Sequence, residues 1–140
     1  MPAPIPLALA LLVRDGAALL VHRSPSRQAY PDCWDLAGGH VEADEPPGDA
    51  VRRECFEELG IRIHEPLPMT LTVTDPSLDV HAFLVTRWDG EPLNAAPEEH
   101  DDLGWFRPDQ LAGLTLAHPS SRQDIHLAIR SAQREDGSDA

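Results

Sequence analysis

The chain has 140 residues, with 24 Asp and Glu against 11 Lys and Arg, which gives a formal charge of −13. This length fits one domain, and the apolar (41%) and charged (25%) fractions are those of a globular protein. The acidic excess repels polyanions, so it excludes a general nucleic-acid binder and disfavours an anionic membrane surface as partner. A small polyphosphate stays compatible with this charge if a divalent cation mediates the contact.

The first third of the chain predicts a β-hairpin, a loop and a short strand. Two apolar runs, residues 7–13 and 17–22, flank an Asp-Gly pair, which is a strong hairpin signal. Residues 23–33 are polar and have no hydrophobic period, so we expect a loop there. Residues 34–41 are typical of a short strand that is interrupted by a pair of glycines.

Two helices and further strands are expected in the rest of the chain. A helix is predicted over residues 46–59, because proline is tolerated in a first turn and Gly60 suits the residue after the last turn. A second helix is predicted over residues 120–133 from its apolar spacing. Strands are predicted over residues 61–64, 69–74, 80–88 and 103–107, with a long loop over 89–101. The predicted fold class is α+β, an α/β/α sandwich with a mixed sheet, formed by a single domain over 1–134 with a disordered tail over 135–140.

The two cysteines and the N-terminal apolar run point to a reducing, aqueous compartment. Cys33 and Cys55 do not make a disulfide framework, and the sequence has no CxxC pair. We expect Cys55 to pack on the apolar face of the first helix and Cys33 to be a bystander thiol. The run over residues 7–13 is too short to cross a bilayer and has no basic segment before it. A cytoplasmic location is therefore expected.

The first predicted helix gathers three carboxylates on one face. Glu54, Glu57 and Glu58 fall within about 100° of arc, because steps of three and four residues return to the same side. Each like-charge pair would cost a few tenths of a kcal/mol on an isolated helix. Arg53 can neutralise part of this charge, and a hard divalent cation such as Mg²⁺ can neutralise the rest. The alternative is an exposed acidic face that binds nothing.

The surrounding sequence resembles a known family motif. Residues 39–61 read GHVEADEPPGDAVRRECFEELGI, which is similar to the Nudix box G-x5-E-x7-R-E-u-x-E-E-x-G-u, where u is a bulky apolar residue. The fixed positions are filled by Gly39, Glu45, Arg53, Glu54, Glu57, Glu58 and Gly60, with Cys55 and Ile61 at the two u positions. Residues 34–42 resemble the family's W-x-L-P-G-G-x-x-E lead-in and residues 103–106 its late W-F strand, so the resemblance covers nearly the whole chain. Ala37 and Asp44 depart from the usual proline and glycine, at positions that bear on loop shape.

The resemblance implies a Nudix hydrolase that cleaves a diphosphate linkage with Mg²⁺, or Mn²⁺, as cofactor. It implies that Glu54, Glu57 and Glu58, with the carbonyl of Gly38, are the metal ligands. Arg53 would orient the glutamates and Glu45 would brace the turn into the helix. One box glutamate, Glu54 or Glu57, is the expected base that accepts the proton of the attacking water.

Residues outside the box complete the expected site. The resemblance implies a further carboxylate in the loop before the last strand, and we favour Glu98 over Glu99. Arg23 is expected to hold a substrate phosphate, and His118 is expected to contact the base of a nucleotide. Each of these residues has an alternative without a functional role. Glu98 or Glu99 would be a solvated loop carboxylate, Arg23 a surface arginine and His118 a residue at the start of a helix. Trp105 and Phe106 either stack on a base or pack in the core, and Trp34 is expected to pack in the core.

Two functions of different classes follow from the sequence. The first is an Mg²⁺-dependent hydrolase that acts on a nucleoside triphosphate, or another nucleoside diphosphate derivative, by attack of water at phosphorus. The second is a non-catalytic Nudix domain that binds a nucleotide as a sensor; the complete set of box carboxylates favours the hydrolase. The family's isomerase branch would need a cysteine and glutamate context that the sequence lacks. Either a monomer or a homodimer is compatible with the sequence.

Overall fold

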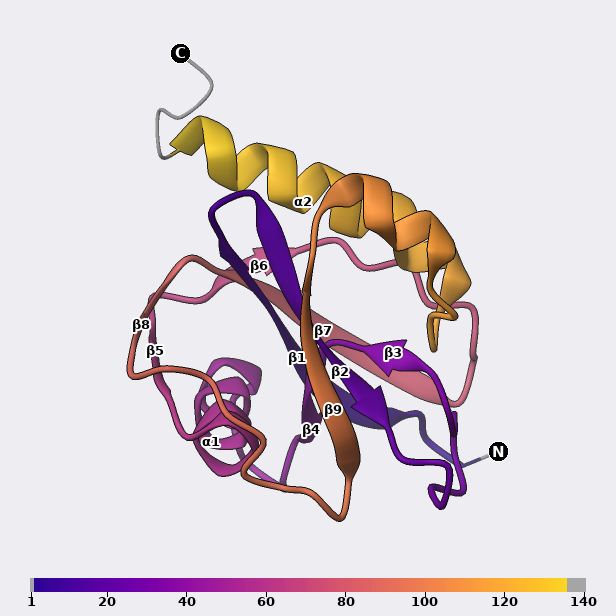
Figure 1. Ribbon diagram of the computed structural model, residues 1–140. Coiled ribbons are helices and arrows are strands. Elements are labelled where there is room, and N and C mark those ends of the chain that lie inside the picture. Colours follow the sequence, from indigo (N-terminus) through magenta and orange to yellow (C-terminus); the bar gives the residue numbers. More distant parts are fainter. Residues whose placement is uncertain (1, 136–140) are drawn as a thin grey trace.

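The computed structural model describes residues 2–135 and shows a mixed β-sheet with a helix on each face (Figure 1). The strands are β1 (Ile5–Arg14), β2 (Ala17–Arg23), β3 (Trp34–Asp35), β4 (Ala37–His40), β5 (Arg62–His64), β6 (Leu67–Met69), β7 (Leu78–Val85), β8 (Arg87–Asp89) and β9 (His100–Phe106). The helices are α1 (Pro47–Leu59) and α2 (Arg122–Glu135), with short 3₁₀ helices η1 (Pro108–Gly113) and η2 (Pro119–Ser121) before α2. The predicted α+β class and mixed sheet are confirmed.

Strand β1 is the hub of the main sheet. It pairs in parallel with β7 and in antiparallel with β2 and β4. The sheet continues outward through β3 and β9 on the β2 side and through β6 on the β7 side. A separate two-stranded sheet pairs β5 with β8.

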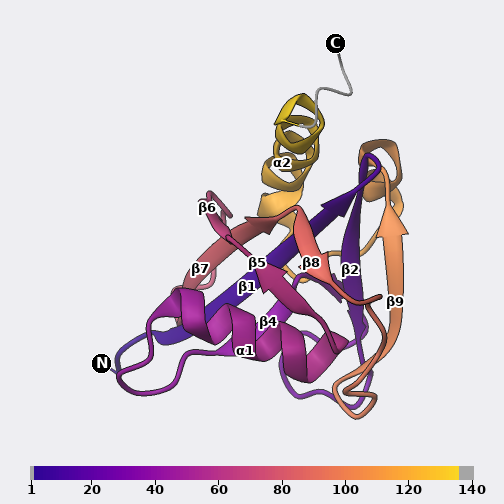
Figure 2. The ribbon, with the colours of Figure 1, turned by 90° about the vertical axis from the view of Figure 1, so that its left-hand side faces the viewer.

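The β-hairpin opens toward one end, and the strand segment that follows fills the gap. Strands β1 and β2 pair only near their turn, from Leu12↔Leu19 to Arg14↔Ala17. Farther from the turn, β3 pairs with β2 and β4 pairs with β1 over Leu7↔His40 to Ala10↔Ala37. This insertion brings the glycine pair of β4 to α1, which lies across β1 and β4 in Figure 2.

Side-chain alternation in β1 and β2 divides the core into two layers. One layer packs on α1 and includes Ala8, Ala10, Leu12, Leu19, Val21, Val51, Cys55 and Leu59. The other packs on α2 and includes Leu9, Leu11, Val13, Ala18, Leu20, Ile125, Ala128 and Ile129. Both faces of these strands are therefore buried, and each fully buried leucine contributes about 1.5–3 kcal/mol. This packing fixes the height of α1 above the sheet and so the depth of its carboxylates.

Both predicted helices are present within two residues of the expected bounds. Gly60 adopts the left-handed conformation (φ 70°), and its N–H donates to the carbonyl of Phe56 at 3.0 Å, which ends α1. Helix α2 continues to Glu135. The remainder of the predicted tail, residues 136–140, lies outside the described residues.

Three strand predictions need correction. The predicted strand 80–88 is two strands, β7 and β8, which break at Thr86 so that β8 can pair with β5. The prediction for 69–74 is wrong, because the strand ends at Met69 and the N–H of Thr72 donates to the Asp124 carboxylate on α2 at 2.7 Å. Strand β9 begins earlier than expected, at His100, because its pairing with β2 starts there.

Both cysteines and both α-helices lie within residues 2–135. Within residues 2–135, no helix is both long enough and apolar enough to cross a bilayer. Cys33 and Cys55 are free and buried in the described chain. Burial raises the pKa of Cys55 to about 12, so this thiol packs in the core, as predicted, and is not nucleophilic at neutral pH.

Candidate active site

Arg53 joins the carboxylates of α1 into one network. Its Nε and Nη2 donate to the two carboxylate oxygens of Glu45, each at 3.0 Å, and Nη2 also donates to the carbonyl of His40 at 3.0 Å. Its Nη1 donates to Glu54 Oε1 at 3.0 Å and to Glu57 Oε2 at 3.3 Å. These bonds raise the pKa of Arg53 and lower the pKa of Glu45. The guanidinium therefore holds the loop before α1 and two helix carboxylates in one arrangement.

The glycine pair of β4 lies directly against the carboxylates of Glu58 and Glu54. The N–H of Gly38 donates to Glu58 Oε1 at 3.0 Å. A Cβ at Gly38 (φ 144°) would come within 2.1 Å of the Ala8 carbonyl oxygen, and one at Gly39 would come within 2.6 Å of the Glu54 carboxylate carbon. Only glycine lets this backbone approach both the neighbouring strand and the helix.

Two of the helix carboxylates are withdrawn from water. Glu58 is 5% exposed, and burial raises its pKa from 4.5 to about 7. Burial also raises the pKa of Glu54, although Arg53 opposes that shift. Removing carboxylates from water costs free energy unless a counter-charge is near. The arrangement therefore favours the approach of a cation.

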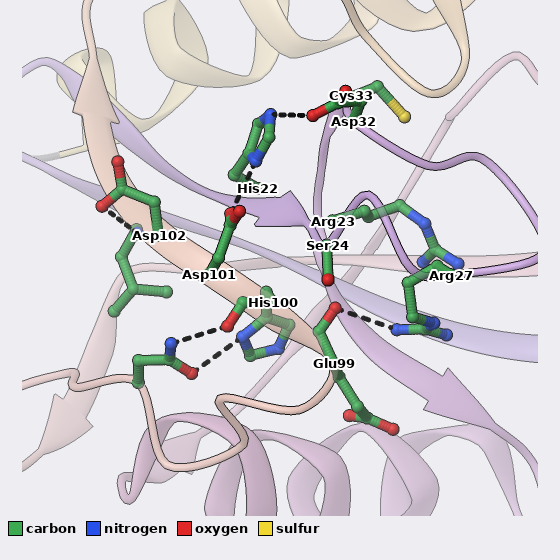
Figure 3. Close-up of polar contacts among 12 residues, drawn as sticks. His22, Arg23, Ser24, Arg27, Asp32, Cys33, Glu99, His100, Asp101 and Asp102 are labelled. Carbon is green, nitrogen blue, oxygen red and sulfur yellow. Dashed lines mark hydrogen bonds and ion pairs between the residues drawn. The ribbon is translucent and has the colours of Figure 1, made fainter.

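Glu99, the residue directly before strand β9, brings a third carboxylate to this place. One oxygen of Glu58, one of Glu99 and a ring nitrogen of His100 all lie within 4.8 Å of one another. In Figure 3 the Glu99 carboxylate points away from β9 toward the helix beneath it. Glu98 is exposed and lies outside this group, so our preference for Glu98 does not match the placement. The oxygen donors and the ring nitrogen fit a divalent cation.

These groups open into a cavity of about 250 Å³. Its walls include Glu54, Glu58, Glu99, Gly38, Gly39, Arg23, Arg27, Tyr30, Asp35 and His118. Two residues that the sequence places far from the box, Arg23 and His118, thus lie in the same cavity as the box carboxylates. Among the described residues, Glu57 and Glu98 are not part of the cavity wall, and Glu57 stays at the rim with 56% of its side chain exposed.

The comparisons with known proteins agree on one family. The family model for the NUDIX domain matches residues 4–127. This chain belongs to the Nudix family. It is 34% identical over 140 residues to the CTP pyrophosphohydrolase of Escherichia coli K12, across 94% of this chain and 98% of that protein. It is 32% identical over 129 residues to the nucleoside triphosphatase NudI of Escherichia fergusonii, across 84% of this chain and 91% of that protein.

Solved structures of similar proteins show the same fold. The crystal structure of a MutT NUDIX hydrolase from Burkholderia pseudomallei superposes with a TM-score of 0.78 and 33% identity, across 89% of this chain and 99% of that chain. The solution structure of the E. coli ORF135 protein gives a TM-score of 0.73 and 29% identity, across 94% of this chain and 91% of that chain. The Nudix resemblance of the sequence is thereby confirmed.

Beyond the Nudix box, the loop after β2 forms much of the cavity wall. Arg23 donates from Nε to the carbonyl of Tyr30 at 2.9 Å and from Nη2 to that of Ala29 at 2.8 Å, so it shapes this loop. The Tyr30 hydroxyl donates to Asp75 at 2.5 Å, and its ring meets the His118 ring edge-on at 4.7 Å. Sequence reasoning missed Tyr30, because only the fold of this polar loop turns its ring toward the final helix.

Asp35 was also missed, although the sequence holds a signal for it. Its side chain is about 10% exposed; Oδ1 accepts the N–H of Leu36 at 2.8 Å, and Oδ2 lies 3.8 Å from Arg23 Nη1. Burial raises the pKa of this carboxyl. The signal is its position: an acidic residue stands between the apolar residues Trp34 and Leu36, in the strand that leads into the Nudix box. A buried carboxylate in a cavity wall is available to a ligand.

The aromatic residues of β9 pack on other side chains. Trp105 stacks on Trp88 with ring centroids 6.2 Å apart and lies under the Arg14 guanidinium at 4.4 Å. Phe106 meets Trp34 edge-on at 4.8 Å. Within the described chain none of these rings lines the cavity, so the packing alternative is the one that the structure supports for Trp105 and Phe106.

Proposed function

We propose that this Nudix hydrolase cleaves nucleoside triphosphates to a nucleoside monophosphate and pyrophosphate by attack of water at phosphorus. The observation that carries the proposal is one cavity. Its wall joins the buried carboxylate of Glu58 and the partly buried carboxylates of Glu54 and Glu99 to the polar residues Asp35 and His118. The first part suits a metal-bound polyphosphate, and the second suits a nucleotide base. The names of the related CTP pyrophosphohydrolase and NudI support the same substrate class.

The carboxylates would hold Mg²⁺ or Mn²⁺. Glu58, Glu99 and the Gly38 carbonyl are the proposed inner ligands, and Glu54 and Glu57 extend the set toward the rim. When bound, a divalent cation reduces the repulsion between the phosphate oxygens and the attacking water and makes that water more acidic. Glu98 lies outside the group formed by Glu58, Glu99 and His100, so Glu99 is the proposed carboxylate from this loop.

The chain's own residues supply the base and its orientation. Glu54 is the proposed proton acceptor, because burial raises its pKa and so strengthens it as a base. Arg53 holds the Glu54 carboxylate at 3.0 Å, which fixes its direction without touching substrate. Arg23 and Arg27 also line the cavity, and their positive charges would attract the phosphate chain.

The pocket favours a base that carries an exocyclic amino group. Arg23 Nη1 lies 3.8 Å from Asp35 Oδ2 and favours the ionised form of this buried carboxyl, which only accepts hydrogen bonds; an amino group can donate to it whereas a carbonyl oxygen cannot. His118 and Tyr30, in edge-on contact with each other, offer ring surface beside it. Cytosine meets this requirement and uracil does not, so CTP and dCTP are the proposed preferred substrates over UTP.

A nucleotide panel tests the proposal and separates it from a binding-only domain. The protein is incubated with each nucleoside triphosphate and Mg²⁺, and the products are resolved by anion-exchange chromatography. Monophosphate and pyrophosphate in equal amounts, with turnover abolished by EDTA, would support the hydrolase. Nucleotide-induced thermal stabilisation without any product would instead favour the non-catalytic nucleotide-binding function.

A further inference from the structure

The imidazole of His100 lies deeply buried beside the proposed metal carboxylates. It is the first residue of β9, where it pairs with Arg23 of β2, and only 3% of its surface is exposed. Its Nε2 atom has no hydrogen-bond partner among residues 2–135. A buried ring nitrogen without a partner is uncommon, because burial removes its contact with water. Glu58 Oε1 lies 3.4 Å from this nitrogen, so Nε2 is available to a cation bound between them.

Asn94 determines which ring nitrogen of His100 carries the proton. The Asn94 amide group donates from Nδ2 to the His100 carbonyl at 2.7 Å, which turns its Oδ1 toward His100 Nδ1 at 3.0 Å. Because Oδ1 only accepts, Nδ1 must donate. With its proton on Nδ1, the ring presents a lone pair at Nε2 when a cation binds there. A metal-binding histidine shows this same pattern, in which the other nitrogen donates to a fixed oxygen.

The Nε2 atom of His100 faces the carboxylate group. His100 Nε2 lies 3.4 Å from Glu58 Oε1, and the donor atoms of Glu58, Glu99 and His100 all lie within 4.8 Å of one another. Figure 3 shows Glu99 and His100 as consecutive residues at the start of β9. Two donors that each stand about 2.0–2.2 Å from one metal ion are at most about 4.4 Å apart, so small side-chain rotations would bring these atoms onto a shared ion.

We propose that His100 Nε2 is a nitrogen ligand of the metal ion that Glu58 and Glu99 hold. This inference rests on the proposed function in that it uses the same carboxylates. Mg²⁺ prefers oxygen ligands, whereas imidazole suits first-row transition metals. The nitrogen ligand therefore shifts the site toward Mn²⁺ over Mg²⁺.

Electron spin echo spectroscopy of the Mn²⁺-loaded full chain, without nucleotide, tests the ligation directly. Nitrogen modulation from a bound imidazole is expected for the unaltered protein and for His118→Leu, which removes the other buried histidine of the cavity. His100→Leu, with its fold checked by circular dichroism, should lose the modulation. Absence of nitrogen modulation in the unaltered protein at saturating Mn²⁺ would overturn the proposal, and so would its persistence in His100→Leu.

Metal affinity gives a second readout, with the fraction of free Mn²⁺ measured from its solution spectrum. His100→Leu should weaken Mn²⁺ binding by about tenfold or more while Mg²⁺ binding, measured by competition, changes much less. Asn94→Ala, which removes the hydrogen bonds to the ring and to the carbonyl of His100, should weaken Mn²⁺ binding by about tenfold. Equal losses for both metals would contradict the proposal. Hydrolysis without nitrogen modulation would refute only His100 ligation, and modulation without hydrolysis would refute only the proposed function.

Discussion

Neutralising Glu58 should make the metal-free protein more stable at neutral pH. The carboxyl is buried, and its pKa in the folded chain is raised from the ordinary value of 4.5 to about 7. Below pH 4.5 the group is protonated in both the folded and the unfolded chain, so it costs nothing. Between pH 4.5 and 7 only the unfolded chain ionises, and the free energy of unfolding falls progressively. Above pH 7 the loss is complete.

The magnitude follows from the two pKa values. Because one pKa unit corresponds to about 1.4 kcal/mol, the shift amounts to roughly 3 kcal/mol at pH 8. Glu58→Gln stays uncharged at every pH and can still accept the N–H of Gly38. The free energy of unfolding of Glu58→Gln should therefore be roughly 3 kcal/mol higher than that of the unaltered protein at pH 8, and nearly equal to it at pH 4.5.

Urea unfolding in EDTA, followed by tryptophan fluorescence at both pH values, measures this difference. Glu98→Gln is the matched control, because its exposed carboxylate should give no pH-dependent gain. Saturating Mg²⁺ should narrow the gap or reverse it, since the cation stabilises only the protein that binds it. If Glu58→Gln is no more stable than the unaltered protein at pH 8, the carboxylate carries no desolvation cost and the reasoning fails.

Other substitutions probe the geometry around the box. Gly38→Ala should lower the free energy of unfolding by at least about 2 kcal/mol, because the added Cβ would meet the backbone of Ala8. Gly39→Ala should fold but lose about a hundredfold in kcat, because its Cβ would displace the Glu54 carboxylate. Thermal melts measure the first effect and turnover measures the second. Arg53→Lys keeps the charge but not the planar fork, so kcat should fall with little change in KM; a rise in KM alone would contradict the orienting role. Asp35→Asn should reduce the kcat/KM preference for CTP over UTP by about tenfold, and an unchanged preference would remove Asp35 from base recognition.

Local signals predicted much of the fold. The bounds of α1 follow from the prolines at its start and from Gly60 at its end, which act within a few residues. Residues 69–74 alternate like a strand, yet the chain leaves the sheet after Met69. The reason is a partner distant in sequence: Asp124 takes the N–H of Thr72. No pattern inside residues 69–74 contains that information.

The candidate site shows the same division. The spacing of the box places Glu54 and Glu58 on one side of α1 without reference to the rest of the chain. The choice between Glu98 and Glu99 depends on where β9 begins to pair with β2, and the register shifts there between His22 and Arg23. Glu98 and Glu99 lie in the turn just before β9, where the N–H groups of Glu99 and His100 both donate to the Ala96 carbonyl, so this turn and the strand start decide which carboxylate enters the cavity.

The turnover of Glu99→Gln and Glu98→Gln beside the unaltered protein tests the central claim most directly, with pyrophosphate release from CTP and Mg²⁺ as the measurement. The unaltered protein and Glu98→Gln should release pyrophosphate at similar rates. Glu99→Gln should be slower by about a thousandfold, because a bound metal contributes several kcal/mol to the transition state. No release by the unaltered protein, or equal losses in the two variants, would contradict the claim that Glu99 and the helix carboxylates Glu54 and Glu58 form the hydrolytic centre.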